Sequence, residues 1–378
     1  MAAIPLRNNR LFRNFTHLCR VIVALTFIFS GAVKSIDPWG TALSVNNYLV
    51  SYGLESLKPI AMIFSIWLCG AELMMGLMLT FKVRTRLISI FALVSMTFFT
   101  VLTFLSATWI PVEDCGCFGD ALKLTPWETF LKNLIILPMV VVVWYRHRKQ
   151  RILDFRRWEI VATITFCTIA MGVGTYCYFN LPLIDFLPYD EGSNIYAMIA
   201  VQHDTGSEEM SEEEYVLIYR NRQTGEVREF SIDDKEWQDA SRWEWVETRV
   251  DNEAPAVQTL VSEFTITDPE GDVTRDLLTR SGYVYMICVT ELDDVTEKCA
   301  ERLRRVVDHA IETEGLVVCL TPQPLREVTH HSFAESDPVR CYNIDATVMK
   351  TMLRAKNGLV VLKDGVIEKK YNCRNIDF

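Results

Sequence analysis

The chain has 378 residues, half of them hydrophobic, and a formal net charge of −10. This charge is unevenly divided: residues 1–180 carry 17 basic and 9 acidic side chains, whereas residues 181–378 carry 21 and 39. An acidic half would repel the phosphates of a nucleic acid, so the composition excludes a nucleic-acid-binding protein. It favours a basic, apolar half followed by an acidic half exposed to water.

Five apolar segments in the first half are long enough to cross a bilayer, whose core requires about 20 helical residues. They span residues 17–36, 58–81, 87–110, 128–145 and 159–180. The first follows several arginines, as a signal peptide does, but no small-residue cleavage site comes after it. We therefore expect a multi-pass protein of the lipid bilayer that keeps its first span.

Lysine and arginine predict the orientation, because they concentrate in cytoplasmic loops. Residues 82–86 and 146–157 are rich in them, whereas residues 37–57 and 111–127 contain Lys123 alone. We therefore expect a protein of the cell inner membrane with a cytoplasmic N-terminus. Five spans then place the acidic C-terminal half in the periplasm.

The loop before the fourth span contains the sequence EDCGCFGD, residues 113–120, in which Cys115 and Cys117 flank one glycine. A disulfide between such close neighbours has difficulty reaching the preferred geometry, which makes it easier to reduce. The periplasm permits disulfides. Cys115 and Cys117 are therefore our candidate catalytic pair, in a labile dithiol or disulfide.

The charges around this pair have opposing effects on the stability of a thiolate. Lys34, near the same end of the first span, would stabilise a thiolate, whereas Glu113, Asp114 and Asp120 would destabilise one. A structural turn and a metal site stay open as alternatives. We expect no metal, since a closed zinc site needs four ligands and two cysteines are local.

Three stretches resemble the DoxX/MauE-like family of membrane proteins. They are RVIVALTFIFSGAVKSIDPWGTALSVNNYLVSYGL (20–54), GAELMMGLML (70–79) and DCGCFGDALKLTPWETFLKNLIIL (114–137). The resemblance implies a four-helix membrane bundle over residues 1–150. MauE-type proteins are associated with the maturation of a disulfide-rich periplasmic dehydrogenase subunit, and DoxX-type proteins with quinone-linked oxidation. A quinone is therefore the cofactor that the resemblance suggests, although the residues identify none.

Two ionisable residues inside the spans are further candidates, because intramembrane charges are commonly functional. Measured from the ends of their spans, Glu72 lies roughly 12 Å deep and Arg20 roughly 5 Å deep, at 1.5 Å per residue. We expect Arg20 and Glu72 to form a supporting ion pair, or a pair that fixes helix register. Lys34 is expected to lie too far along the bundle to reach Glu72.

The second half begins after a basic loop and a fifth, tethering span, residues 151–182. Residues 183–262 predict an acidic linker and a β-hairpin over 215–232 that turns at Thr224-Gly225. Within residues 263–378 we expect a strand–turn–strand at 263–278. A strand, helix and strand at 283–289, 294–314 and 315–321 then form a right-handed parallel crossover. A helix near 345–355 and a hairpin turning at Asp364-Gly365 complete the region.

This order resembles an exterior α/β thioredoxin-like domain of the TlpA or peroxiredoxin type. Where that family has C-x-x-C, residues 290–298 read TELDDVTEK, so the resemblance implies a degenerate domain that docks a partner. Three cysteines are expected to be buried, namely Cys288, Cys319 and Cys341. Cys299 and Cys373 are the candidates for exposed thiols.

The fold class expected is thus a membrane all-α bundle followed by an α/β domain. The favoured function is thiol–disulfide or quinone-linked redox chemistry at the C-x-C pair, which exchanges electrons with a periplasmic thiol protein. Whether this makes the chain an enzyme is left open. The alternative is a non-enzymatic membrane-anchored scaffold or assembly factor for envelope proteins. A transporter is disfavoured, since we find no inverted repeat.

Overall fold

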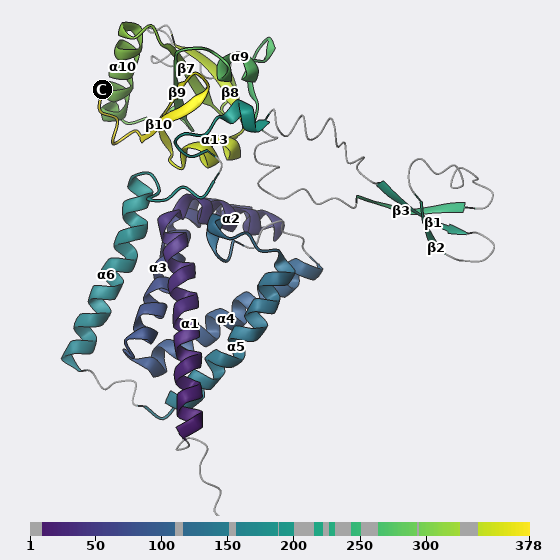
Figure 1. The fold of residues 1–378 in the computed structure, drawn as a ribbon, viewed down its shortest axis with the longest axis vertical. Coiled ribbons are helices and arrows are strands. Elements are labelled where there is room, and N and C mark those ends of the chain that lie inside the picture. The colour runs from purple at the N-terminus through teal and green to yellow at the C-terminus, as the bar shows by residue number, and fades with distance from the viewer. Residues whose placement is uncertain are drawn as a thin grey trace, which may run out of the picture.

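The computed structural model describes residues 10–109, 116–150, 156–187, 189–199, 215–221, 227–230, 243–250, 264–292, 295–325 and 339–378. They form a helical region, a region built on a mixed sheet, and a small three-stranded sheet (Figure 1).

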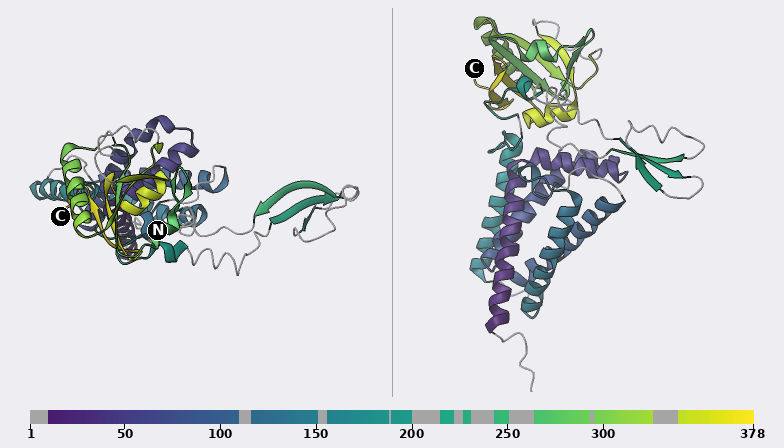
Figure 2. Two further views of the ribbon diagram at one scale, coloured as in Figure 1. Left: turned by 90° about the horizontal axis from the view of Figure 1, so that it is seen from above. Right: turned by 45° about the vertical axis from the view of Figure 1, so that its right-hand side comes forward.

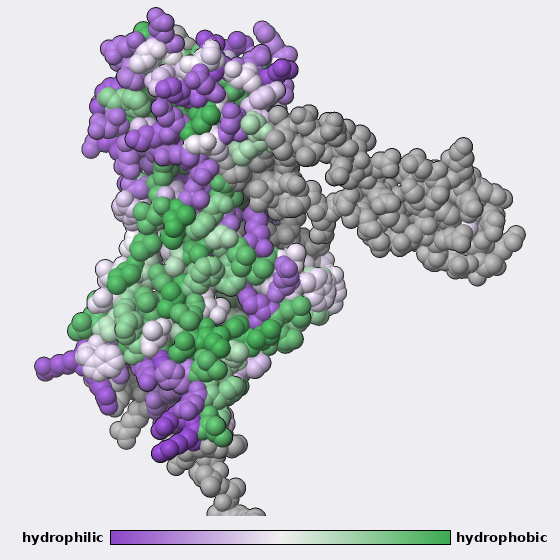
Figure 3. All heavy atoms as spheres, viewed as in Figure 1, coloured by the Kyte–Doolittle hydropathy of each residue, from purple (hydrophilic) through white to green (hydrophobic). Residues whose placement is uncertain are grey.

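Five described helices are long and apolar enough to cross a membrane, which confirms that prediction. They are α1 (Arg10–Ile36), α3 (Ala61–Thr80), which follows a 3-10 turn η2 (Glu55–Ile60), α4 (Thr85–Thr108), α5 (Pro126–His147) and α6 (Arg157–Phe179). Many of their large apolar side chains are exposed, and they form the hydrophobic band in Figure 3. Such a band is stable only against lipid, so the chain is a multi-pass membrane protein.

A further helix, α2 (Pro38–Ser51), occupies a segment that the sequence analysis treated as a loop. It begins because Asp37 is its N-cap, accepting a hydrogen bond from the Gly40 amide, and because Pro38 stands at the first helical position. The helix crosses one end of the bundle (Figure 1). Because α2 runs across the bundle, it covers that end and does not add a sixth span.

Helices α1 and α3 pack so closely that two glycines are required between them. A Cβ on Gly31 would lie 2.3 Å from the backbone nitrogen of Leu73, and one on Gly76 would lie 2.6 Å from that of Ile28. Residue 31 is therefore level with residue 73, and residue 28 with residue 76. These contacts show that the two helices run antiparallel and fix their register.

We call the end of the bundle that faces the C-terminal sheet the proximal end, and the opposite end the distal end. Helix α2 lies at the proximal end (Figures 1 and 2), and the described residues around Cys117 lie there too, because Gly116 approaches Ser44 of α2. The α3–α4 junction and residues 148–150, which follow α5, lie at the distal end, where Arg86 donates to the carbonyl of Gln150. The C-x-C loop and the C-terminal sheet thus share one end of the bundle.

The C-terminal region is built on a seven-stranded sheet of order β10-β9-β6-β7-β8-β4-β5. The strands are β4 (Ile266–Asp268), β5 (Gly271–Asp272), β6 (Tyr283–Val289), β7 (Leu316–Thr321), β8 (Arg340–Ile344), β9 (Asn357–Lys363) and β10 (Val366–Asn372). The parallel pairing of β6 with β7 around α10 (Glu297–Glu312) confirms the predicted crossover. The final hairpin is also confirmed, with positive φ at Asp364 and Gly365.

Two hydrophobic cores lie on opposite faces of this sheet. One contains buried residues of α10, such as Leu303 and Val306. The other contains residues of the short helices α9 (Thr274–Leu278) and α13 (Ala346–Leu353), together with Tyr189 and Ile195 from the segment that follows α6. This is a mixed α/β domain, and the expected thioredoxin-like identity stays a prediction.

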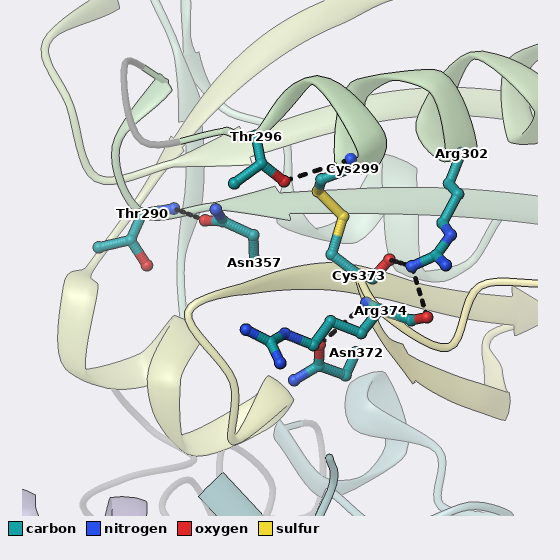
Figure 4. Close-up of a disulfide and its surroundings, with 8 residues drawn as sticks. All are labelled: Thr290, Thr296, Cys299, Arg302, Asn357, Asn372, Cys373 and Arg374. Carbon is teal, nitrogen blue, oxygen red and sulfur yellow. Dashed lines mark hydrogen bonds between the residues drawn. A yellow bond between two sulfur atoms is a disulfide. The ribbon is translucent and has the colours of Figure 1, made fainter. Parts of the chain in front are cut away.

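Cys299 and Cys373 are not exposed thiols, so that expectation is wrong. They form a disulfide that ties the start of α10 to the residue after β10, and each cysteine is only 6% exposed (Figure 4). Arg302 supports the bridge by donating to the carbonyl oxygens of Cys373 and Arg374. Cys288 and Cys319 are buried as predicted, and Cys341 is half-buried.

A separate antiparallel sheet has the order β2-β1-β3, with β1 (Tyr215–Asn221), β2 (Val227–Phe230) and β3 (Trp243–Val250). The pairing of β1 with β2 confirms the hairpin predicted over residues 215–232. Its expected turn at Thr224-Gly225 lies outside the described residues.

Candidate functional site

The second cysteine of the C-x-C pair, Cys117, is half-buried at the proximal end, while Cys115 lies outside the described residues. The Cys117 carbonyl oxygen accepts a hydrogen bond from Ser30 Oγ of α1 at 2.7 Å. Gly116 has a φ of +57°, and a Cβ there would lie 2.8 Å from Ser44 Oγ of α2. Glycine is therefore required between the cysteines both by its backbone angle and by the approach of α2.

The residue after the pair anchors the loop to two helices. The Phe118 ring packs edge-on against Phe29 of α1, with ring centroids 5.3 Å apart. Lys132 of α5 places its ammonium 4.1 Å from the centroid of the same ring. Cation–π and aromatic contacts of this kind hold a loop with modest energy but defined geometry. Cys117 is thus held between α1, α2 and α5.

Glu72 pairs with Lys34, and the expected Arg20–Glu72 pair is wrong. Lys34 Nζ lies 3.0 Å from both Glu72 carboxylate oxygens, and the two side chains are 6% and 5% exposed. Ser30 Oγ lies 2.7 Å from Glu72 Oε2 as well as from the Cys117 carbonyl. One serine hydroxyl therefore stands between the buried ion pair and the C-x-C loop.

The wrong pairing came from the assumption that the distal ends of the first and second apolar segments lie at the same depth in the membrane. Because residue 31 is level with residue 73, Glu72 is level with about residue 32. Arg20 then lies roughly 18 Å away along the bundle, at 1.5 Å per residue. Helix α1 simply continues beyond the distal end of α3, a shift in register that hydropathy does not reveal.

Arg20 has a different partner at the distal end. Its Nη1 donates to the carbonyl oxygen of Leu79, and to that of Thr80 at 2.9 Å. These are carbonyls of the last turn of α3, which lack partners within the helix. A cation there also complements the negative end of the helix dipole. Arg20 thus stabilises the end of α3 and lies away from the candidate site.

A cavity of about 770 Å³ adjoins Cys117 inside the bundle. Its lining is mostly apolar and aromatic, with side chains such as Trp67 and Phe99. Polar groups gather among these, including Lys34, Glu72 and Asn133. Asn133 is only 2% exposed, and its Nδ2 has no hydrogen-bond partner among the described residues. A buried donor without a partner is costly, so this amide favours a ligand with an acceptor.

A second charged cluster, which sequence reasoning missed, lies beside the loop. Arg354 comes from the residue after α13 and is 1% exposed. Its Nη2 lies 3.1 Å from Asp37 Oδ2 and also donates to Asp120, three residues after Cys117. A Cβ on Gly40 would collide with both carboxylates. An isolated arginine gives no sequence signal for such a site, because its partners are far away in the chain.

Asp37 belongs to this second charged cluster and lies directly after the first span. Burial raises the pKa of its carboxyl to about 6, although the Arg354 guanidinium and the Gly40 amide act to lower it. The neighbouring carboxylates of Asp120 and Asp185 add to the increase. Burial outweighs the attraction of the guanidinium, and repulsion between the two carboxylates that share it adds to the effect, so the pairing does not hold the pKa down.

The described residues contain no group of three or more His, Cys, Asp or Glu side chains suited to a metal ion. The expectation of no metal at the C-x-C pair stays a prediction, since Cys115 is not among them.

The helices, the buried ion pair and the C-x-C loop define a multi-pass helical membrane protein. Residues 13–146 match the family whose description is methylamine utilisation protein MauE, so the membrane region is similar to that family. The chain is also 29% identical, over 155 residues, to a protein named Protein TlpB from Flavobacterium psychrophilum. That match covers 40% of this chain and 41% of the relative. No solved structure matches the chain.

Proposed function

We propose that this protein is a thiol–disulfide redox component of the inner membrane in which Cys115 and Cys117 alternate between dithiol and disulfide. The observation that carries the proposal is the position of Cys117. It lines a cavity of the bundle together with the buried Lys34–Glu72 pair. A thiol at the border between the loop and an intramembrane cavity can react on one side with a water-soluble partner and on the other with a lipid-soluble one.

The proposed electron donor is a dithiol protein of the periplasm, which the orientation predicted from the basic loops would bring to the proximal end. One of its thiolates attacks the Cys115–Cys117 disulfide, and its second thiol resolves the mixed disulfide. The partner leaves as a disulfide, while Cys115 and Cys117 are left as thiols. The C-terminal domain has no cysteine in residues 290–298, so we assign it a docking role.

The proposed electron acceptor is an isoprenoid quinone in the cavity. The Cys115–Cys117 dithiol gives up two electrons and two protons to become a disulfide, and the quinone takes up both to become a quinol. The apolar walls suit a hydrophobic ring, and Asn133 Nδ2 and the Lys34 ammonium would face its carbonyl oxygens. The cavity lies within the size range of small-molecule sites.

Trapping of free thiols with an alkylating reagent in native membranes tests this function. We expect Cys115 and Cys117 to be a mixture of thiol and disulfide that shifts toward the disulfide when a short-chain quinone is added. Cys115→Ser or Cys117→Ser should abolish oxidation of a dithiol substrate and leave the protein folded. Cys167→Ser is the matched control, because Cys167 is an exposed cysteine of α6 outside the site.

Two results would contradict the proposal. Substrate oxidation that persists in both single variants would show that the pair is not the redox centre. A pair that stays fully oxidised or fully reduced under every condition would make the C-x-C segment a structural turn, and the scaffold function would then stand in its place.

A further inference from the structure

The C-terminal domain contacts the membrane region through a buried side chain, that of Arg354. Arg354 stands at the end of α13 in a left-handed backbone conformation, with a φ of +55°. A residue other than glycine rarely adopts this angle, and here it directs a guanidinium toward the bundle. Its ion-pair partners are Asp37, the N-cap of α2, and Asp120, in the short 3-10 turn η3 (Gly119–Ala121).

Asp120 is the part of this cluster that belongs to the C-x-C loop. The loop is attached to the bundle by Ser30 at the Cys117 carbonyl and by the packing of Phe118. The Arg354–Asp120 contact is a third attachment, and the only one of these three that comes from the C-terminal domain. It joins residues that are 234 positions apart in the chain.

Arg354 is not needed merely to hold the domain in place, because other contacts do so. Lys370 of β10 donates to the Asp185 carboxylate and to the carbonyl of Tyr189, both in the segment that follows α6. Asn375 donates to the side-chain oxygen of Asn180 at 2.6 Å. The Asn375 bond tethers the domain to the end of α6, and the Lys370 bonds hold the segment after α6 against β10. Of these three side chains, only Arg354 contacts the C-x-C loop.

We propose that Arg354 is a positioning residue that clamps the C-x-C loop and so keeps Cys117 against the cavity and shielded from large soluble molecules. The guanidinium nitrogen Nη2 contacts both carboxylates, so a single buried cation bridges α2 and the loop. Without it, Asp37 and Asp120 would face each other with no cation between them. Their repulsion would push the loop away from α2. The clamp rests on geometry alone, and only its effect on turnover depends on the proposed redox function.

The test measures how fast Cys117 reacts with a bulky maleimide in the full-length, detergent-solubilised protein. Cys115→Ser is the background, so that a single loop thiol is present, and peptide mass spectrometry separates it from other thiols. Arg354→Met should raise the labelling rate about tenfold or more, because a charge-assisted hydrogen bond to the loop is lost. Arg354→Lys should lie between Arg354→Met and the parent.

Lys370→Met is the control for general loosening of the domain, since it removes a buried cation whose partners, Asp185, Tyr189 and Met352, lie outside the loop. It should leave the labelling rate near that of the parent. Asp120→Asn serves as a second variant if Arg354→Met fails to fold. Combined with Arg354→Met, it should add little to either single change, because both remove the same contact.

An unchanged rate in Arg354→Met would overturn the proposal, as would an equal increase in Lys370→Met, which would mean that general loosening of the domain exposes Cys117. The proposal would also be refuted if the increases in labelling rate caused by Arg354→Met and by Asp120→Asn multiplied in the double variant. This readout needs no electron transfer. The clamp can therefore fail while the redox function stands, and the redox function can fail while the clamp stands.

Discussion

Lys34 and Glu72 bring two opposite charges together in a place from which water is nearly excluded. Each charge would be costly to bury alone, and each is tolerated because the other lies 3.0 Å away. The Ser30 hydroxyl lies 2.7 Å from both Glu72 Oε2 and the Cys117 carbonyl oxygen. At the scale of single residues, this hydroxyl connects the buried ion pair with the C-x-C loop.

Removing one member of the pair should cost more than removing both. We expect Lys34→Met or Glu72→Gln to lower the free energy of unfolding by about 3–5 kcal/mol, because an uncompensated buried charge or polar group is left behind. The double variant should lose less than the sum of the two. Titration with denaturing detergent, followed by tryptophan fluorescence, measures these values. Additive losses would show that the two side chains are energetically independent.

Arg20 and Lys34 look equivalent in the sequence, but they lie at opposite ends of the bundle. Arg20 is a second buried cation on the same helix as Lys34, yet it bonds to the last carbonyls of α3 at the distal end. Hydropathy locates both charges within a span. The contact at Gly31 then decides which of them meets Glu72.

At the scale of secondary-structure elements, the register of α1 against α3 depends on small residues. Gly31 and Gly76 let the two backbones approach until a Cβ would overlap with the opposite chain. Close approach of this kind is a common way for membrane helices to associate, since lipid supplies no hydrophobic driving force between them. The same approach carries Lys34 and Glu72 to within bonding distance.

A larger side chain at Gly31 should therefore separate α1 from α3. We expect Gly31→Val to lower the thermal midpoint of the detergent-solubilised protein markedly and to weaken the Lys34–Glu72 coupling. Gly172→Ala is the matched control, because a Cβ at Gly172 of α6 has nothing within 4 Å. It should be neutral or slightly stabilising, by up to about 1 kcal/mol. Equal effects of the two substitutions would contradict the close packing.

At the scale of the whole molecule, the C-terminal domain and the bundle are joined by polar contacts. The buried Arg354 side chain reaches the end covered by α2, and Asn375 donates to Asn180 at the end of α6. The domain therefore sits at the proximal end, next to α2 (Figures 1 and 2), where Arg354 contacts Asp120.

The junction should make stability depend on pH in an unusual direction. Because the folded-state pKa of Asp37 is raised to about 6, the native state binds a proton between about pH 6 and 4 that the unfolded chain does not bind. This group therefore favours folding more strongly as the pH falls through 6, by about 3 kcal/mol at most. Most paired carboxylates instead have a lowered pKa and lose their contribution to stability as the pH falls.

The comparison of wild type with Asp37→Asn isolates this contribution, because asparagine does not titrate. Between pH 7.5 and 5, the thermal midpoint of the wild type should rise relative to that of the variant. The groups that face Asp37, namely Arg354, Asp120 and Asp185, are present in both proteins. Parallel curves over this range would show that Asp37 has an ordinary pKa.

The sequence by itself determined the features that local chemistry controls. Five apolar runs predicted five spans because a bilayer fixes their length. Apolar strands on either side of a helix predicted the β6–α10–β7 crossover, and the Asp364-Gly365 turn predicted the last hairpin. The stretch around Cys117 indicated the family and the candidate site. Each of these depends on residues close together in the chain.

Only the tertiary structure decided which residues contact each other when they are far apart in the sequence. The register of α1 and α3 replaced Arg20 by Lys34 as the partner of Glu72, and packing of α10 against the end of β10 joined Cys299 to Cys373. Arg354 met Asp37 and Asp120 because two regions dock. Such contacts depend on the relative positions of whole elements, which are set by close packing and which no local pattern encodes.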